Sequence, residues 1–291
     1  MIKINPLLLA AVGMVSAVAY AAPELTVTSI GQEIESENTS NGADLDEVTL
    51  YNRVGLAYGD WTFGLEAGKR WAINFDDTKD VHSINHRLQI DVWKKINEDL
   101  KLGFRYRGQR EYDRYYARWD WNHGLLWSAG DVWYEANNES GVVGISAADY
   151  IKGEVYPIGF KYGTFKVGYF VEFHELVGSK EAEQKENYLE QQIRAYWTFY
   201  KGEKLTLSTE GRFTITADED HNGKVAAGYR VYDDFGRNRL YIKANYAVNE
   251  NLSVYGSYGY EMRDWKMEDG HKDDYTKKYW QDVIVGWSYK F

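Results

Sequence analysis

The chain has 291 residues, no cysteine and only three prolines, and aromatic residues make up 16% of it. Its formal net charge is -10 and its mean hydropathy is -0.57. The lack of cysteine excludes a disulfide scaffold, a lipidated cysteine and a cysteine-based metal site, and the acidic balance argues against a nucleic-acid partner. No linker rich in proline or serine divides the chain, so a single domain is expected.

The N-terminal segment has the pattern of a secretory signal peptide. Lys3 is followed by an uncharged apolar stretch over residues 7–18, and Ala19-Tyr20-Ala21 matches a small-x-small cleavage site. About a dozen apolar residues are too few to cross a bilayer core, which takes roughly 20. We therefore expect residues 1–21 to be removed by cleavage near Ala21, and residues 22–291 to form the mature domain.

Most of the mature chain alternates apolar and polar side chains with period two, which indicates strands with two different faces. Leu240 and Ile242, for example, alternate with Arg239, Tyr241 and Lys243. Strands are expected at residues 24–36, 46–58, 61–73, 82–94, 100–112, 150–162, 164–177, 188–200, 204–217, 237–249, 251–264 and 276–291.

Residues 113–149 contain a further candidate pair of strands. Tyr115, Ala117, Trp119 and Trp121 alternate with polar or aromatic neighbours, and residues 128–131 (Ser-Ala-Gly-Asp) have the composition of a short turn. This pair makes fourteen strands the expected number. Twelve is the alternative, with 113–149 as one large loop.

The connections between strands fall into two classes. Short turns containing Gly or Asn, the residues that tight hairpins need at positive φ, lie at 58–61, 96–100, 162–165, 200–205 and 248–252. Long acidic connections lie at 37–46, 74–81, 178–187, 218–236 and 266–274. The chain is therefore predicted to be all-β: a transmembrane antiparallel up-and-down β-barrel with short periplasmic turns and long extracellular loops.

The C-terminal strand is typical of such barrels. Trp287, Tyr289 and Phe291 point one way, while Ser288 and Lys290 point the other. The aromatic side chains are expected to face lipid and its interfacial girdle. We interpret Trp287, Tyr289 and Phe291 as the signal that the barrel-assembly machinery recognises, and expect lipid and lipopolysaccharide of a Gram-negative outer membrane around the barrel.

The opposite faces of the strands carry charges that predict a water-filled lumen, since charges in a packed interior would each need a partner. The basic residues predicted to line the pore are Arg53, Arg70, Arg87, Lys101, Arg105, Arg107, Lys166, Arg194, Arg212, Arg239, Lys243 and Lys290. The acidic residues predicted there are Glu66, Asp91, Glu172, Glu210, Glu261 and Asp282.

Two interpretations of this wall remain open. If the other acidic residues lie mostly in the loops, a basic wall behind an acidic rim predicts a preference for anions, because guanidinium groups bind carboxylates well. If Arg and Glu pair across strands, the wall is electrostatically balanced. Flat aromatic rings predicted on the same face offer packing surfaces for sugars, and they are Tyr51, Trp93, Tyr196, Tyr241, Tyr255 and Trp280.

No catalytic or metal-binding motif stands out. His82, His86, His123, His174, His221 and His271 are scattered and lie in no Gly-x-Ser-x-Gly or His-Glu-x-x-His context. We expect neither an enzyme nor a cofactor or metal site. Loop adhesion and a hydrolase assembled from loop residues such as Asp218, Asp220 and His271 remain alternatives.

The short turns, the mature length and the C-terminal Phe291 resemble those of the OmpG-type monomeric porins, and residues 192–196 (Gln-Ile-Arg-Ala-Tyr) are similar to the corresponding strand of that family. The resemblance implies a one-chain, fourteen-stranded pore that passes ions and mono- to oligosaccharides, with residues 218–236 as the gating loop. The family's pH gating is not implied, because residues 237–249 and 251–264 contain no histidine. Twelve-stranded oligogalacturonate-type porins, with their basic lumens, are the second resemblance and imply acidic oligosaccharides as solutes.

Overall fold

The computed structural model describes residues 23–39, 46–73, 81–138, 148–177, 184–222, 230–267 and 278–291. The expected signal peptide and parts of the long connections lie outside these residues. Within the described part of the chain, no helix is long and apolar enough to cross a membrane.

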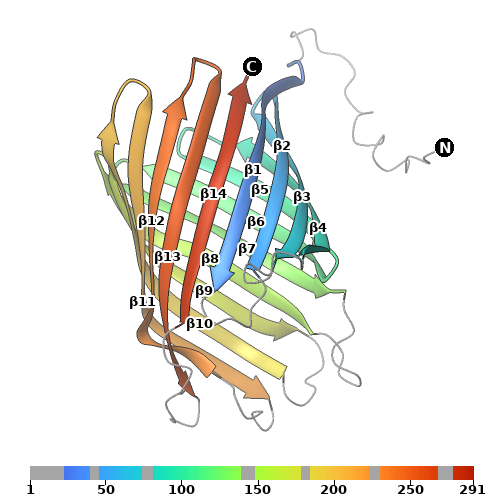
Figure 1. The fold of residues 1–291 in the computed structure, drawn as a ribbon, viewed down its shortest axis with the longest axis vertical. Helices are drawn as coiled ribbons and strands as arrows, with labels where there is room; N and C mark the ends of the chain where they lie inside the picture. Colours follow the sequence, from blue (N-terminus) through green and yellow to red (C-terminus); the bar gives the residue numbers. More distant parts are fainter. Residues whose placement is uncertain are drawn as a thin grey trace, which may run out of the picture.

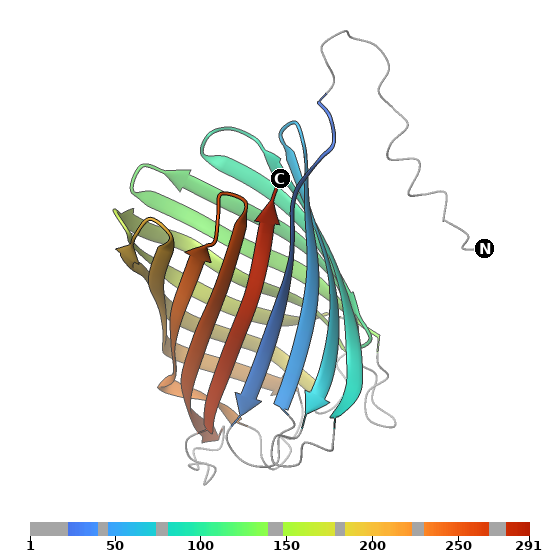
Figure 2. The same ribbon diagram turned by 45° about the horizontal axis from the view of Figure 1, so that its top comes forward.

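Fourteen strands form one closed antiparallel barrel (Figure 1). Each strand pairs with its neighbours in the chain, and β1 pairs with β14 to close the ring, which Figure 2 shows from nearer its upper end. The strands are β1 (Thr26–Thr39), β2 (Asp46–Tyr58), β3 (Trp61–Ile73), β4 (Val81–Lys95), β5 (Leu100–Gln109), β6 (Tyr112–His123), β7 (Leu126–Asn137), β8 (Asp149–Tyr162), β9 (Phe165–Val177), β10 (Gln184–Lys201), β11 (Leu205–Asn222), β12 (Arg230–Ala247), β13 (Leu252–Met267) and β14 (Lys278–Lys290).

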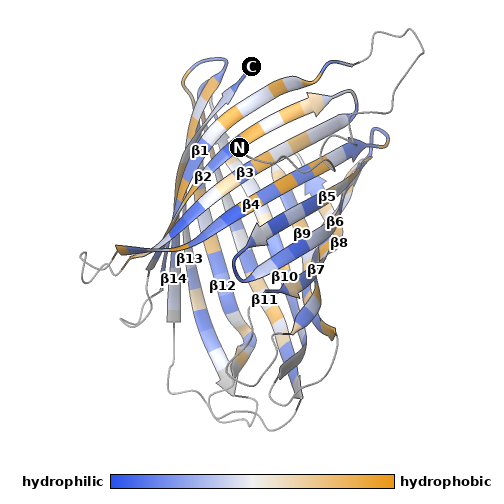
Figure 3. Ribbon diagram, turned by 90° about the vertical axis from the view of Figure 1, so that its right-hand side faces the viewer, coloured by the Kyte–Doolittle hydropathy of each residue, from blue (hydrophilic) through white to orange (hydrophobic). Residues whose placement is uncertain are grey.

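The two faces of the barrel differ in chemistry, and hydropathy alternates along the strands in Figure 3. On β12, Leu240 and Ile242 are 52% and 55% exposed, whereas the Tyr241 ring between them is buried. Large apolar side chains are exposed in the same way on the other strands, including Leu88, Phe104, Ile193 and Val285. An apolar outer face on a closed β-barrel is the arrangement that a bilayer requires, and the fold is the transmembrane barrel that the alternation predicts.

Short turns gather at one end of the barrel, together with the C-terminus (Figure 1). Gly59, Gly124 and Gly163 occupy these turns with φ near +55°, a conformation that side chains disfavour. In two turns of similar sequence, Asn97 and Asn249 each accept hydrogen bonds from two backbone N–H groups through the side-chain oxygen. These contacts fix the hairpins and thus the register of the flanking strands.

Residues 113–149 do contain the extra strand pair, but its predicted turn is wrong. Residues 128–131 lie inside β7, and the chain turns instead at Gly124 and Leu125. Gly130 has a different purpose, because a Cβ there would lie 2.4 Å from the Cη2 atom of Trp119. The glycine makes room for a neighbouring indole and does not mark a turn.

The predicted loop 218–236 is also shorter than expected. β11 continues to Asn222 and β12 begins at Arg230, so strands replace both ends of the segment. Phe235 has a positive φ of 59° beside a register shift in β12, so this strand is irregular near its start. Only residues 223–229 of the expected loop lie outside the described residues.

Candidate functional site: the inner face of the barrel

Ion pairs between strands that are not neighbours identify the inner face. Arg118 of β6 contacts Asp91 of β4 at 2.5 Å, across β5. Neighbouring strands are about 4.8 Å apart, so side chains two strands apart meet most readily on the concave side of the sheet. The cross-strand register places every basic and acidic residue named from the sequence for the pore wall on this same face.

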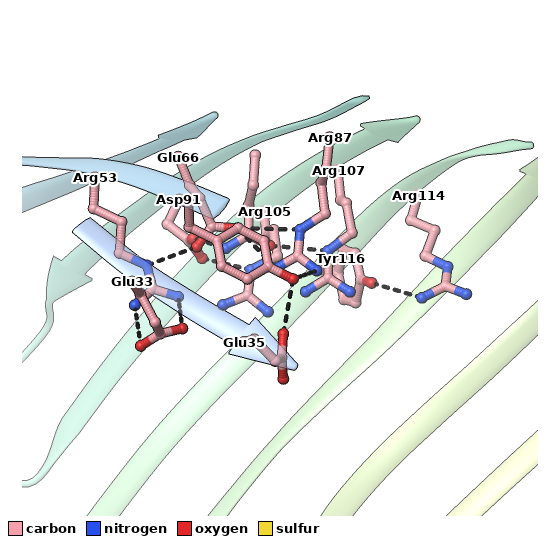
Figure 4. Close-up of polar contacts among 12 residues, drawn as sticks. Glu33, Glu35, Arg53, Glu66, Arg87, Asp91, Arg105, Arg107, Arg114 and Tyr116 are labelled. Carbon is pink, nitrogen blue, oxygen red and sulfur yellow. Dashed lines mark hydrogen bonds and ion pairs between the residues drawn. The ribbon is translucent and has the colours of Figure 1, made fainter. Parts of the chain in front are cut away.

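A first network joins β1 to β4 (Figure 4). The Arg53 guanidinium donates through both Nη atoms to Glu33, at 2.7 and 2.8 Å, and through Nε to Glu66 at 2.8 Å. Arg87 reaches the other oxygen of Glu66 at 2.7 Å. Paired guanidinium and carboxylate groups with this geometry hold each other in place, and much of their charge is neutralised locally.

The network continues through β4 to β7. Asp91 accepts hydrogen bonds from Arg105 Nε at 2.7 Å and from Arg118 Nη1 at 2.5 Å. Arg118 Nε also donates to Asp131 at 2.6 Å. Glu135 of the same strand β7 contacts Arg114 and, at 2.7 Å, Lys152. Arginines and carboxylates therefore alternate around this sector of the wall.

A second network covers β9 to β13. Glu261 pairs with Arg237 at 3.2 Å, and with Arg239 and Arg263. Farther along, Glu210 accepts hydrogen bonds from Arg212 at 2.6 Å and from Lys243 at 2.5 Å. Most of the charge on this part of the inner face is also compensated by a neighbour.

These pairs correct one expectation from the sequence. The acidic residues beyond the six predicted ones are not confined to the loops, because Glu33, Asp131, Glu135 and Glu190 all accept hydrogen bonds from cations on the inner face. The wall is therefore closer to the balanced interpretation than to the basic one. Arg237 begins the expected strand 237–249 and was not among the predicted pore residues, yet it lies in β12 and pairs with Glu190 on the inner face.

Two arginines depart from this pairing. Among the described residues, Arg107 and Arg194 have no carboxylate within 4.0 Å. Each guanidinium instead donates from Nε to a glutamine side chain, Gln89 at 2.9 Å and Gln192 at 2.7 Å. Neutral partners therefore orient these two cations.

Unpaired acids collect at the seam where the barrel closes. Asp282 of β14 stands opposite Glu37 of β1, and it is buried with no hydrogen-bond partner for Oδ1. Glu35, two residues along β1, accepts a hydrogen bond from the Tyr51 hydroxyl at 2.9 Å. The inner face of the seam between β1 and β14 thus carries an acidic stripe.

The predicted inner aromatics lie among the cations. The Arg87 guanidinium is 4.7 Å from the centre of the Tyr51 ring, and the Arg239 guanidinium is 3.9 Å from that of Trp280. Tyr255 donates to Glu33 and Tyr196 shares a hydrogen bond with Tyr156. Rings and charges are therefore interleaved on the wall.

The histidines do not come together. His174 contacts Glu172 at 3.2 Å on the inner face, whereas His123 contacts Asp99 near a turn. The side chains of His221 and His271, and the acidic pairs in the long connections, lie outside what the structure describes. Within the described ranges, no group of three or more His, Asp or Glu side chains has the geometry to hold a metal ion.

Several inner-face residues were not predicted from the sequence. Arg114, Arg118, Asp131 and Glu135 lie on β6 and β7, in the segment whose register was left unassigned. The period-two alternation of Tyr115 to Trp121 is the signal that places Arg114 and Arg118 on the inner face, once that segment is taken as a strand.

No protein-family model matches the sequence, and no curated protein matches it. Among solved structures, the chain is similar to a bacterial polysaccharide outer membrane secretin, with a TM-score of 0.53 and 9% identity over 90% of this chain and 98% of that one. A toluene transporter, TodX, of Pseudomonas putida has a TM-score of 0.47 and 8% identity over 94% and 90% of the two chains. An anion-selective porin from Comamonas acidovorans has a TM-score of 0.44 and 11% identity over 92% and 100%. At 9% identity, the similarity to the secretin shows a shared barrel fold and no more.

Proposed function

We propose that this protein is an outer-membrane porin through which small hydrophilic solutes, including ions and mono- to oligosaccharides, diffuse passively. The observation that carries the proposal is the charged, aromatic-rich inner face of a closed barrel whose outer face is apolar. Arg107 and Arg194 have no ion-pair partner among the described residues, and such charges are costly away from water, so they favour a water-filled interior over a packed one.

The number of strands supports a water-filled bore. Eight-stranded barrels have interiors just wide enough for side chains to fill, and diameter grows roughly linearly with strand number. Fourteen strands give a wider ring. We propose that one chain forms the whole pore, as in the OmpG-type porins, and that the monomer is the functional unit.

The orientation follows the rule for such barrels. The short turns and the C-terminus would lie in the periplasm and the long connections outside the cell, in contact with lipopolysaccharide. Trp287, Tyr289 and Phe291 would present the C-terminal strand to the barrel-assembly machinery. The protein would act without a cofactor and without catalysis.

A liposome-swelling assay tests the solutes. Proteoliposomes containing the refolded chain are expected to swell in isotonic monosaccharide and more slowly in trisaccharide, because permeation through an open bore falls with solute size. Protein-free liposomes are the control. Equal swelling with and without the protein would remove the proposed function and return attention to adhesion or hydrolysis by the loops.

A second candidate is a porin selective for acidic oligosaccharides. Arg107 and Arg194 favour it, since each presents a guanidinium that has no carboxylate within 4.0 Å among the described residues and donates to a glutamine instead. A reversal potential measured in a salt gradient separates the candidates: anion preference supports the selective porin, and cation preference contradicts it.

A further inference from the structure

Two amide side chains lie on the outer face of the barrel, at the seam where the ring closes. Gln32 of β1 stands opposite Asn52 of β2 on one side and opposite Trp287 of β14 on the other. These three strands run side by side (Figure 2). The chain neighbours Glu33 and Arg53 pair with each other on the inner face, so both amides point outward, and both are exposed. We call Gln32 and Asn52 the outer amide pair.

The outer amide pair lies inside the apolar outer face and not at its edge. Asn52 is the seventh of the 13 residues in β2. On both strands the next outward-facing residue on either side of the pair is apolar, and these residues are Ile30, Ile34, Leu50 and Val54. In a bilayer the two amides therefore face acyl chains, which offer no hydrogen-bond partner.

The hydrogen bonds of the pair leave donors unused. Gln32 donates from Nε2 to Asn52 Oδ1 at 2.8 Å, and Trp287 donates from Nε1 to Gln32 Oε1 at 3.3 Å. Among the described residues, the Asn52 side-chain nitrogen donates to no acceptor. A side-chain amide nitrogen carries two N–H donors, and a polar group without a partner is costly in hydrocarbon. A partner that brings an acceptor would therefore stabilise this surface.

A second copy of the same surface supplies what is missing. A side-chain amide is both donor and acceptor, so two outer amide pairs related by a two-fold axis complement each other. Asn52 stands opposite Ala67 of β3, whose small side chain lets another backbone approach closely. Exposed apolar side chains around the pair offer packing surface, and they include Ile34, Leu65 and Val285.

We infer that two copies of this protein associate in the membrane through the outer face of β14, β1 and β2, with their outer amide pairs hydrogen-bonded to each other. Each copy keeps a complete barrel of its own, so the monomer remains the unit that conducts. The inference uses only the membrane-spanning fold, and it does not depend on what passes through the bore.

Chemical cross-linking of the refolded chain in lipid vesicles tests the association. The chain has no cysteine, so Ala67→Cys introduces a single thiol beside the outer amide pair. Ala244→Cys is the matched control, because Ala244 is an exposed alanine on the outer face of β12, outside the proposed interface. With a short bismaleimide, Ala67→Cys is expected to give cross-linked dimers at protein-to-lipid ratios where Ala244→Cys gives only monomers.

Substitutions in the Ala67→Cys chain test whether the amides drive the association. Asn52→Leu and Gln32→Leu should each weaken it about tenfold, measured from the dimer fraction over a series of protein-to-lipid ratios, because each removes hydrogen bonds made in hydrocarbon. Asn245→Leu removes an amide from the inner face of β12 and should change association less than about twofold. Mobility on unheated gels checks folding, and Gln32→Leu serves if Asn52→Leu does not fold.

Three outcomes overturn the inference: Ala67→Cys cross-links no more than Ala244→Cys, the two amide variants cross-link as well as their parent, or Asn245→Leu weakens association as much as Asn52→Leu. In the second case the amides only tie β1 to β2. Cross-linking needs no current, so the result is separate from the channel proposal. A chain that conducts without associating keeps the channel and loses the interface, and one that associates without conducting keeps the interface and loses the channel.

Discussion

Arg237 of β12 donates to Glu190 of β10 at 2.8 Å, across the intervening strand β11. The Glu190 side chain is fully buried and also accepts hydrogen bonds from Tyr188, Gln192 and Thr214. The ion pair therefore ties alternate strands together on the inner face. Removing the guanidinium partner of a buried carboxylate leaves an uncompensated buried charge, which destabilises the folded protein.

Removing this guanidinium should destabilise the barrel. Arg237→Ala leaves Glu190 buried without its cation, and we expect a loss of about 3 kcal/mol in the free energy of unfolding, measured by urea titration in lipid vesicles. Arg70→Ala is the control, because Arg70 and Glu47 are both 34% exposed and their pair should contribute less than about 1 kcal/mol. Equal losses in the two variants would contradict this role for Arg237.

A methyl group at Gly159 should be poorly tolerated. Its Cβ would lie 2.1 Å from Cε2 of Trp127, so Gly159→Ala is expected to cost about 1–3 kcal/mol by overpacking. Gly64→Ala, whose nearest neighbour is Asp91 Cβ at 3.4 Å, makes an ordinary contact and should have a small effect. The cost of Gly159→Ala should fall in a Trp127→Leu background. An unchanged cost there would mean that the indole is not the cause.

Because the outer face is apolar, a charged substitution there should destabilise the barrel more than the same substitution on the inner face. Ile242 is 55% exposed on the outer face of β12, and Ile242→Arg should cost about 2–4 kcal/mol if the side chain lies near the bilayer midplane. Asn245→Arg places the same side chain on the inner face of the same strand and should cost much less. Folding yield in vesicles measures both, and equal yields would argue against the assigned faces.

Much of the fold could be predicted from the sequence because period-two alternation and turn residues act locally. In strands with a clear apolar face, such as β5 and β12, the alternation separates the side chains of the two faces as the structure does. The total of fourteen strands is confirmed. Alternation identifies a face without any knowledge of the partner strand. For that reason the predicted pore residues, such as Arg105 and Arg239, lie on the inner face.

The errors have local physical causes. Gly130 was interpreted as part of a turn, since glycine serves both in turns and where a large ring needs space, and the sequence does not say which. Residues 218–222 were expected in a loop because polar residues occupy both faces of β11 there. Both errors concern segments where local composition had two explanations.

The ion-pair network was not predictable in the same way. Whether Arg237 meets Glu190, Glu261 or solvent depends on the register of several strands and on side-chain conformations, which alternation does not specify. The sequence therefore left a basic wall and a balanced wall as equal alternatives. The observed pairs around Glu66, Asp91 and Glu261 favour a wall that is balanced over most of its area.

Single-channel recording in a planar lipid bilayer tests the central claim most directly. The refolded chain is expected to produce steady open steps of current in simple salt solution, because the charged inner face would line a water-filled bore. Protein heated to unfold it is the control and should give no steps. Folded protein that inserts into the bilayer without conducting would contradict the account, since it would mean that the interior of the barrel is closed to ions.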